Sequence, residues 1–254
     1  MKFESEYLEE LKNKFYSIKQ MGFIQSNRSH NTGIGKTFED LLGKIEDNKA
    51  NADFGDIEIK TQRESSSSLV TLFSKSPNYP RGANTILREN FGYPSPENPE
   101  LKILHTTIYN NNFSNVKNKY YFSFKVDRIN DEIKILVFDY KTKNILLDNV
   151  TYSFSVIKQA IEKKIKKIAY IKANTKTEFN GSESFHYLSM ELFHNPSFNK
   201  FIELLEKQII AIDIRIGVYK NPLSKTYGKT HDHGTAFRIS SDHLEKLFTR
   251  TIIE

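Results

Sequence analysis

The alternation of polar and branched apolar residues from Asp56 to Lys60 is the feature that most constrains the fold of this chain. A period of two residues is typical of a half-buried strand. Ile57 and Ile59 would face one side of such a strand, and Asp56, Glu58 and Lys60 would face the other. The pattern therefore predicts a sheet with one apolar face and one face that carries carboxylates.

A further carboxylate stands just before this strand. Asp53 precedes Gly55, and glycine permits the chain to bend there. Two or three carboxylates and one lysine therefore converge at the start of the strand. Carboxylate oxygens suit a hard cation such as Mg²⁺, and a neighbouring lysine can orient or deprotonate a water molecule. These residue types predict metal-dependent hydrolysis of a phosphodiester, with either Asp53 or Asp56 as the first metal ligand.

Composition limits the class of protein. The chain has 254 residues, enough for one large domain or two intimate lobes, and its aromatic content of 13% supplies a core that excludes wholesale disorder. The absence of cysteine excludes disulfides and thiolate metal sites. A net charge of +6 fits a polyanionic partner. We expect a cytoplasmic protein, because no apolar run reaches membrane-spanning length and the charged N-terminus does not resemble a signal peptide.

A glycine-rich stretch at residues 32–37 invites comparison with a phosphate-binding P-loop. The P-loop pattern needs a glycine five residues before its Gly-Lys pair, and His30 occupies that place. We therefore interpret the stretch as a glycine turn that enters a short helix. Glu39, in the first turn of that helix, could project toward the strand that carries the carboxylates.

The segment from residue 74 to residue 99 lacks strong periodicity and is rich in proline. We expect a long loop, which in a compact domain is usually functional or disordered. It carries Lys75, Arg81 and Arg88. A DNA-facing arm and a plain solvated loop both remain open.

A second informative stretch runs from residue 211 to residue 239. Strand-like alternation places Asp213 and Arg215 on one face, and a lysine-rich loop then leads to His231, His233 and Arg238. Arginine can read guanine O6 and N7, and aspartate can accept a hydrogen bond from cytosine N4. Two histidines and an aspartate could instead bind a metal. From the residues alone, base reading, metal binding and a purely structural role stay open.

Four motifs, in this order along the chain, resemble those of the MvaI/BcnI restriction endonucleases, relatives of the mismatch-repair nicking enzyme MutH within the PD-(D/E)XK nucleases. The motifs are Thr32-Gly33-Ile34-Gly35-Lys36-Thr37-Phe38-Glu39-Asp40-Leu41-Leu42, Asp53 with Glu58-Ile59-Lys60, Asp213-Ile214-Arg215-Ile216-Gly217, and Lys229-Thr230-His231-Asp232-His233-Gly234-Thr235-Ala236-Phe237-Arg238-Ile239. The stretches 72–77 and 80–85 also resemble this family, and the likeness is nearest to its MvaI members.

The resemblance implies an α+β (mixed α/β) fold with a mixed central sheet flanked by helices. It implies a single endonuclease unit over residues 1–254, with two lobes around a DNA cleft. The catalytic lobe would span approximately residues 1–110 plus part of the C-terminal region, and the DNA-recognition lobe approximately residues 111–250.

The resemblance also assigns roles to the motif residues. Asp53 and Glu58 would hold one or two Mg²⁺ ions with the backbone carbonyl of Ile59, Lys60 would serve the attacking water, and Glu39 would support the metal site. The family spacing favours Asp53 over Asp56 as the metal ligand. Ala52 stands where the family name has proline, a position that sets backbone shape rather than chemistry. Residues expected to contact DNA are Asp213, Arg215, Lys229, His231, Asp232, His233 and Arg238, with Lys75, Arg81 and Arg88 as further candidates.

The implied activity is that of a type II restriction endonuclease. Members of the family cut double-stranded DNA at CC-N-GG sites, between the second C and the central base, and the MvaI likeness implies CCWGG. A monomer would nick the two strands in turn, and a DNA methyltransferase of the same system would accompany it without a stable complex. The alternatives are a MutH-like strand nickase and, from another class, a non-catalytic DNA-binding module.

Overall fold

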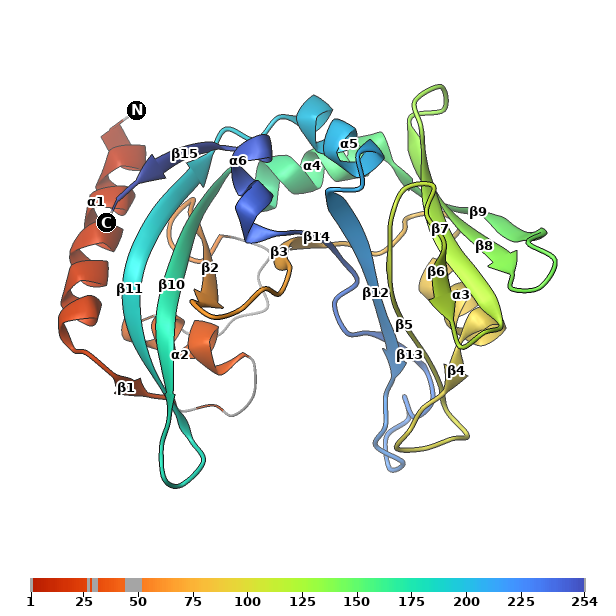
Figure 1. Cartoon of the computed structure of the whole chain (residues 1–254), viewed down its shortest axis with the longest axis horizontal. Helices are drawn as coiled ribbons and strands as arrows, with labels where there is room; N and C mark the ends of the chain where they lie inside the picture. Colours follow the sequence, from red (N-terminus) through yellow and green to blue (C-terminus); the bar gives the residue numbers. More distant parts are fainter. Residues whose placement is uncertain (1, 27, 29–31, 44–51, 254) are drawn as a thin grey trace. The chain divides into compact units, whose positions relative to one another are not determined.

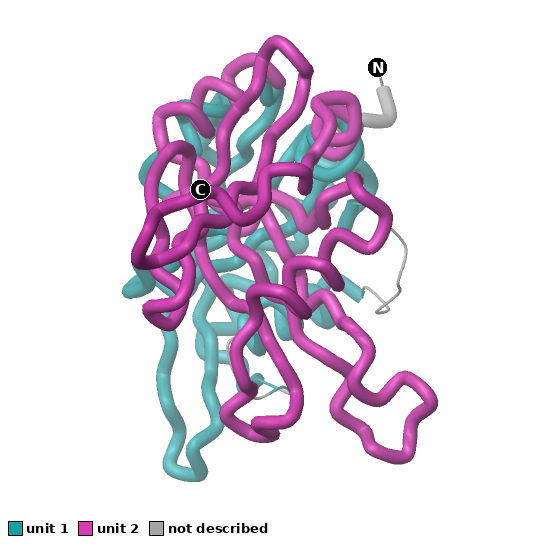
Figure 2. The backbone as a smooth tube through the Cα atoms, turned by 90° about the vertical axis from the view of Figure 1, so that its right-hand side faces the viewer, with its two compact units in different colours: residues 1–70, 161–197, 241–254 teal, residues 71–160, 198–240 magenta. Residues whose placement is uncertain are grey.

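A computed structural model describes residues 2–26, 28, 32–43 and 52–253. The chain forms two compact units, each assembled from separate stretches of sequence (Figures 1 and 2). Unit 1 comprises residues 1–70, 161–197 and 241–254, and unit 2 comprises residues 71–160 and 198–240. The chain therefore passes between the units at residues 70/71, 160/161, 197/198 and 240/241.

Unit 1 is built on a mixed sheet with the strand order β1-β11-β10-β2, and β15 pairs with β11. Strand β2 runs parallel to β10 and lies at the edge of this sheet, whereas β10 and β11 are antiparallel. The strands of the sheet are β1 (Ile24–Gln25), β2 (Glu58–Arg63), β10 (Lys167–Thr177), β11 (Glu183–His194) and β15 (Thr249–Ile252).

Helices α1 (Lys2–Gln20) and α2 (Gly33–Leu41) contribute apolar side chains to the core on one face of this sheet. Phe15 from α1 and Phe38 from α2 join Ile57 and Ile59 in that core, and all four are almost fully buried. Because side chains alternate along a strand, Glu58 and Lys60 lie on the opposite face. The C-terminal elements η1 (Ser241–His243) and α6 (Leu244–Leu247) complete unit 1.

Unit 2 contains two sheets. The first has the order β3-β14-β12-β5-β4, with β13 paired to β12, and the second has the order β6-β7-β8-β9. The first sheet consists of β3 (Val70–Ser74), β4 (Tyr93–Pro94), β5 (Lys102–Ile108), β12 (Ile210–Val218), β13 (Thr230–Asp232) and β14 (Ala236–Ile239). The second consists of β6 (Ser114–Val116), β7 (Tyr120–Asp127), β8 (Glu132–Asp139) and β9 (Ile145–Ser153).

Three helices accompany these sheets, namely α3 (Ala83–Phe91), α4 (Phe154–Lys164, which crosses the boundary at residue 160) and α5 (Phe198–Glu206). Phe237 on β14 is fully buried, and its ring lies 5.1–5.4 Å from the rings of Phe73, Tyr152 and Phe201. Such aromatic pairs contribute about 0.5–1.5 kcal/mol each beyond the area they bury. This cluster fixes the strand that ends the fourth sequence motif.

The mixed α+β class expected from the sequence is confirmed, with six α-helices within the described residues. The division of the chain differs from the expected boundary near residue 110. Residues 71–110 belong to unit 2 because β5 pairs with β12, and residues 161–197 belong to unit 1 because β10 pairs with β2.

The expectation of a long loop between residues 74 and 99 was wrong, because helix α3 occupies its centre. Ala83, Leu87 and Phe91 recur every four residues and are buried. The helix follows Gly82, whose φ of +80° suits glycine. Prolines on both sides hide this short repeat in the sequence. No helix of the described residues has the length and apolarity needed to cross a membrane.

Candidate active site and base-reading surface

The turn before β2 brings Asp53 to the open edge of that strand. Phe54 and Ile57 exchange two backbone hydrogen bonds of 2.9 Å around Gly55, whose φ is +61°. Asp53 Oδ2 then accepts a hydrogen bond of 2.8 Å from the backbone N–H of Ile59. The predicted bend at Gly55 is therefore present, and it sets the Asp53 carboxylate against the strand. A Cβ at residue 55 would lie 2.5 Å from the ring of Tyr7, so only glycine fits.

Glu58 and Lys60 form an ion pair on the exposed face of β2. Lys60 Nζ lies 2.6 Å from Glu58 Oε1, and the two side chains are 22% and 20% exposed. Partial burial strengthens this interaction relative to a fully solvated pair. The structure therefore brings Asp53, Glu58 and Lys60 together at one end of one strand.

Asp56 lies in the turn rather than on the strand, which begins at Glu58. The alternation argument that placed Asp56 on the face of Glu58 was wrong for this reason. Its Oδ2 lies 2.7 Å from Lys167 Nζ, at the start of β10. Asp56 thus joins the turn to the neighbouring strand, and the geometry favours Asp53 as the metal ligand.

Helix α2 places Glu39 beside β2. Thr61 Oγ1 and Glu39 Oε1 lie 3.3 Å and 3.9 Å from the point where a Cβ at Gly35 would sit. Thr61 directly follows Lys60, so Glu39 flanks β2 from the helix side. The Gly-Lys-Thr sequence forms the first turns of α2, and Lys36 pairs with Asp40 at 2.6 Å. The Gly-Lys-Thr sequence is therefore helical and does not form a phosphate-binding loop, as the sequence predicted.

The donor set at β2 fits a hard divalent cation. The N–H and C=O of one strand residue point to the same side, so the Ile59 carbonyl faces the open edge where Asp53 lies. Asp53, Glu58 and this carbonyl offer oxygen atoms only, which suits Mg²⁺ with water in its remaining positions. No group of three or more His, Asp or Glu side chains in the described part of the chain is placed to hold a metal.

Unit 2 presents a second polar cluster around Asp213 on β12. Its carboxylate accepts a hydrogen bond of 2.8 Å from Thr107 Oγ1 on β5. Its other oxygen lies 2.9 Å from Arg215 Nε and 3.0 Å from Arg238 Nε. The Asp213 side chain is 2% exposed, whereas those of Arg215 and Arg238 are 41% and 28% exposed.

This arrangement does not support the expectation that Asp213 reads a cytosine. Its two oxygens are occupied by three side chains, and it lies beneath the surface. The geometry instead gives Asp213 the task of orienting the Arg215 and Arg238 guanidinium groups. An arginine whose Nε is held in this way keeps its terminal N–H groups available for a ligand.

Four rings follow one another beside Arg215. The ring centroids are 4.4 Å apart for Tyr219 and His231, 4.6 Å for His231 and His233, and 6.4 Å for His233 and His105. Burial lowers the pKa of His105 and of His233, and the neighbouring Arg215 and His231, respectively, lower them further. Both rings are therefore neutral at pH 7, and each offers one donor and one acceptor.

Because residue 217 is glycine, the His233 ring can pack against the backbone of β12. A Cβ on Gly217 would lie 2.1 Å from His233 Nε2 and 2.4 Å from its Cδ2. The histidine ring thus rests directly on the backbone of β12. In the motif Asp213-Ile214-Arg215-Ile216-Gly217, Asp213 therefore orients Arg215, and Gly217 leaves the space that the His233 ring occupies.

Asp232 and Arg88 form hydrogen bonds within unit 2. Asp232 accepts hydrogen bonds from Ser76, Asn84, and the backbone N–H groups of Gly234 and Thr235, so it braces the loop after β13 rather than facing a base.

Arg88 is only 6% exposed, and its Nε donates to Thr230 Oγ1 at 3.1 Å. The expectation that Arg88 contacts DNA is therefore not supported. Among the other basic candidates, Arg81 and Lys229 are exposed and Lys75 is half-buried.

The sequence did not indicate Thr107 or His105. Both lie on β5, opposite Asp213 and Arg215 in the antiparallel register, more than a hundred residues before them in the chain. Only the pairing of β5 with β12 brings them to the cluster. Within a strand, the two-residue spacing of His105 and Thr107 places them on a common face.

Comparison with solved structures defines the class of protein. A complex of restriction endonuclease MvaI with its cognate DNA substrate matches with a TM-score of 0.89 and 40% sequence identity, over 98% of this chain and 99% of that chain. MvaI in the absence of DNA matches with a TM-score of 0.63 and 40% identity, over 98% of both chains. Together with the family match, these findings define the chain as a type II site-specific endonuclease.

A match to a protein-family model identifies the family of this chain. The model of the MvaI/BcnI restriction endonuclease family matches residues 12–248, and the chain belongs to this family. The resemblance inferred from the four motifs is thus confirmed. A comparison with curated proteins gave no match.

Proposed function

We propose that the chain hydrolyses phosphodiester bonds of double-stranded DNA, with Mg²⁺, at a short site of the CC-N-GG type. The observation that carries the proposal is the separation of two kinds of chemistry. Unit 1 gathers Asp53, Glu58 and Lys60 on the edge of a sheet. Unit 2 gathers arginine and histidine side chains on β12 and its neighbours.

Asp53, Glu58 and the Ile59 carbonyl would hold the cation, with Glu39 as a supporting acid. When bound, Mg²⁺ supplies Lewis-acid polarisation of the phosphate oxygens and helps to activate water. Lys60 is held by Glu58 at 2.6 Å, close to the oxygens that would receive the cation. From there its ammonium group can orient the attacking water and stabilise the charge that develops on the phosphate.

Base reading would fall to Arg215, Arg238, His231 and His233. Arg215 and Arg238 keep their terminal N–H groups for guanine O6 and N7 because Asp213 holds their Nε atoms. The neutral ring of His233 can donate to an acceptor or accept from cytosine N4. Lys229 and Arg81 are exposed and suit contacts to backbone phosphates.

The proposal also covers the DNA sequence that is recognised and the order in which the two strands are cut. The likeness to MvaI, at 40% identity, supports CCWGG, with cleavage between the second C and the central base. A monomer facing a nearly palindromic site would nick one strand and then rebind in reverse to nick the other. The enzyme would work in the cytoplasm of a prokaryotic cell, alongside a DNA methyltransferase that protects the host sites.

Digestion of a DNA of known sequence, followed by sequencing of the fragment ends, tests this function. We expect cleavage in Mg²⁺ and none in EDTA, with every end derived from CCWGG. Ends at unrelated sequences, or no cleavage in Mg²⁺, would contradict the proposal. Cleavage of one strand only, dependent on mismatch-repair proteins, would instead indicate a MutH-like nickase.

A further inference from the structure

Gln62 and Tyr170 share the sheet face of unit 1 that bears the catalytic pair. Gln62 follows Lys60 by two residues on β2, so its side chain points to the same side. In the parallel register of β2 and β10, Tyr170 stands opposite Lys60. Gln62 is 7% exposed and Tyr170 is 2% exposed. Two buried polar groups thus flank Lys60.

Hydrogen bonds fix the Gln62 amide at both ends. Its Nε2 donates to the backbone carbonyl of Ser68 at 2.7 Å, and its Oε1 accepts from the Tyr170 hydroxyl. Burial raises the pKa of Tyr170 to about 12, so the hydroxyl keeps its proton as a donor. Buried polar groups bound in this way hold one geometry, because an unpaired alternative is costly.

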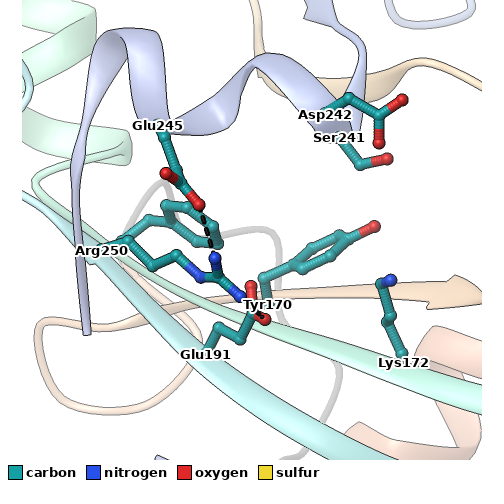
Figure 3. Close-up of a pocket in the computed structure, with 8 residues that line it drawn as sticks. Tyr170, Lys172, Glu191, Ser241, Asp242, Glu245 and Arg250 are labelled. Atoms are coloured by element: carbon teal, nitrogen blue, oxygen red, sulfur yellow. Dashed lines mark hydrogen bonds and ion pairs between the residues drawn. The ribbon is translucent and has the colours of Figure 1, made fainter. Parts of the chain in front are cut away.

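The Tyr170 hydroxyl has a second partner in the C-terminal segment. A hydrogen bond from the Ser241 side chain lowers its pKa, against the larger effect of burial. Figure 3 shows the Tyr170 hydroxyl directed toward Ser241 in a pocket that Lys172 and Asp242 also line. At the other end of this pocket, Arg250 lies 2.5 Å from Glu191 and 2.5 Å from Glu245, which ties the C-terminal segment to β11 (Figure 3).

Both outer partners of the Gln62–Tyr170 pair stand next to a chain crossing between the units. Ser68 comes two residues before Val70, the last residue of the first stretch of unit 1. Ser241 directly follows Ser240, the last residue of unit 2. Ser241 is also only three residues after Arg238, which is anchored on Asp213. The crossings lead into β3 and out of β14, which are neighbours in one sheet.

We propose that Gln62 and Tyr170 are positioning residues that couple the base-reading strands of unit 2 to Lys60 and Glu58. The pair holds both connecting segments against the catalytic strand. A shift of β14 on binding a wrong base is thereby passed to β2 through Ser241 and Tyr170. This inference rests on the proposed function and concerns how recognition controls the rate of cleavage.

The test uses Tyr170→Phe, which removes one hydroxyl and keeps the ring. Single-turnover cleavage is measured on pre-bound CCWGG DNA and on DNA with one outer base pair changed, and affinity is measured in Ca²⁺. We expect the rate at CCWGG to fall about tenfold or more, as for a small misplacement of catalytic groups. The ratio of the two rates should also fall, while affinity for CCWGG stays within about twofold.

Two further variants make the test specific. Gln62→Met removes the hydrogen bonds of the amide with little change of volume. It should reproduce the effect of Tyr170→Phe, and the double variant should show no added effect. Tyr187→Phe is the matched control, because this buried hydroxyl donates to the Ile34 carbonyl at 2.8 Å from the opposite face of the same sheet. It should leave the ratio unchanged.

An unchanged ratio in Tyr170→Phe and Gln62→Met would overturn the inference, even if both rates fell together. So would an equal loss in Tyr187→Phe, a loss of affinity alone, or failure of both variants to fold, since each indicates a structural role. The wild-type protein separates this result from the proposed function. If it fails to cut DNA, the function itself is wrong, whereas normal wild-type cleavage leaves the variants as a test of coupling alone.

Discussion

Single carboxylates in this protein take their roles from burial and from the partners they meet. Asp53 faces a strand edge, where it accepts a hydrogen bond from the backbone. Asp56, three residues on, lies 2.7 Å from a lysine. Asp213 is buried beneath two arginines. Asp232 accepts hydrogen bonds from two side chains elsewhere in unit 2 and from two backbone N–H groups of the loop that follows it. The same residue type thus supplies a metal ligand candidate, a turn brace, an anchor and a loop brace.

The anchor role of Asp213 gives a prediction at the residue scale. Asp213→Asn keeps the shape but removes the charge that orients Arg215 and Arg238. Because a good arginine–guanine pair contributes about 1–3 kcal/mol of discrimination, we expect specific binding in Ca²⁺ to weaken by a similar amount while non-specific binding persists. Fluorescence anisotropy with CCWGG and unrelated duplexes measures both.

A matched control for this variant is Glu206→Gln. Glu206 also holds an arginine in unit 2, with two contacts of 2.7 Å to Arg128, but on an exposed surface. Such pairs contribute little, so discrimination should not change. Equal loss of discrimination in both variants would indicate a general charge effect and would contradict the anchor role.

At the scale of elements, strands β2 and β12 organise the two sites in the same way. Each strand places buried apolar residues beside candidate site residues. A glycine in the turn before β2, and another within β12, stands where the chain or a ring must approach closely. Gly55 turns the chain so that Asp53 reaches β2, and Gly217 leaves space for His233.

Gly217 provides the prediction for this scale. In Gly217→Ala the new Cβ would come within 2.1 Å of His233 Nε2, and the exposed ring would move away while the strand stays intact. We expect cleavage of CCWGG to fall to the level of His233→Ala, with a melting temperature close to that of the wild type. The double variant should show no further loss, and an additive loss would mean that Gly217 acts independently of His233.

The sequence predicted short-range features of these elements more completely than long-range ones. Alternation predicted β2 and β12, and glycine predicted the bend at residue 55, because these features depend on neighbouring residues. It could not place Asp56 in the turn or His105 beside Arg215, since those positions follow from where a strand begins and which strands pair. Burial of Asp213 and Arg88 likewise depends on partners far away in the chain.

For the whole molecule, the division into units matters most. Each unit contains residues from widely separated parts of the chain. The proposed catalytic residues lie within the first stretch of unit 1, and the proposed base-reading residues lie within the last stretch of unit 2. The resemblance could be detected from the four motifs in their order along the chain, whichever unit contains each motif. It therefore identified the family, although the expected division of the chain was different.

Cutting by a monomer that nicks the two strands in turn leads to a prediction at the scale of the whole molecule. A time course on supercoiled plasmid with one CCWGG site should show an open-circular intermediate that rises before the linear product. Its amount should not depend on enzyme concentration once the DNA is saturated, because no second protein copy is needed for a turnover. Direct linearisation without a nicked species would rule out this order of cutting.

We propose that Asp53, at the open edge of β2, belongs to the catalytic centre while base recognition resides elsewhere. The most direct test of this assignment is Asp53→Ala, compared with Asp56→Ala on the same CCWGG duplex. Asp53→Ala should bind the site selectively in Ca²⁺ and yet cut at least about a thousandfold more slowly in Mg²⁺, as expected when a group central to metal-assisted catalysis is lost. Asp56→Ala should retain cleavage. Normal turnover by Asp53→Ala, or loss of cleavage only in Asp56→Ala, would contradict the account.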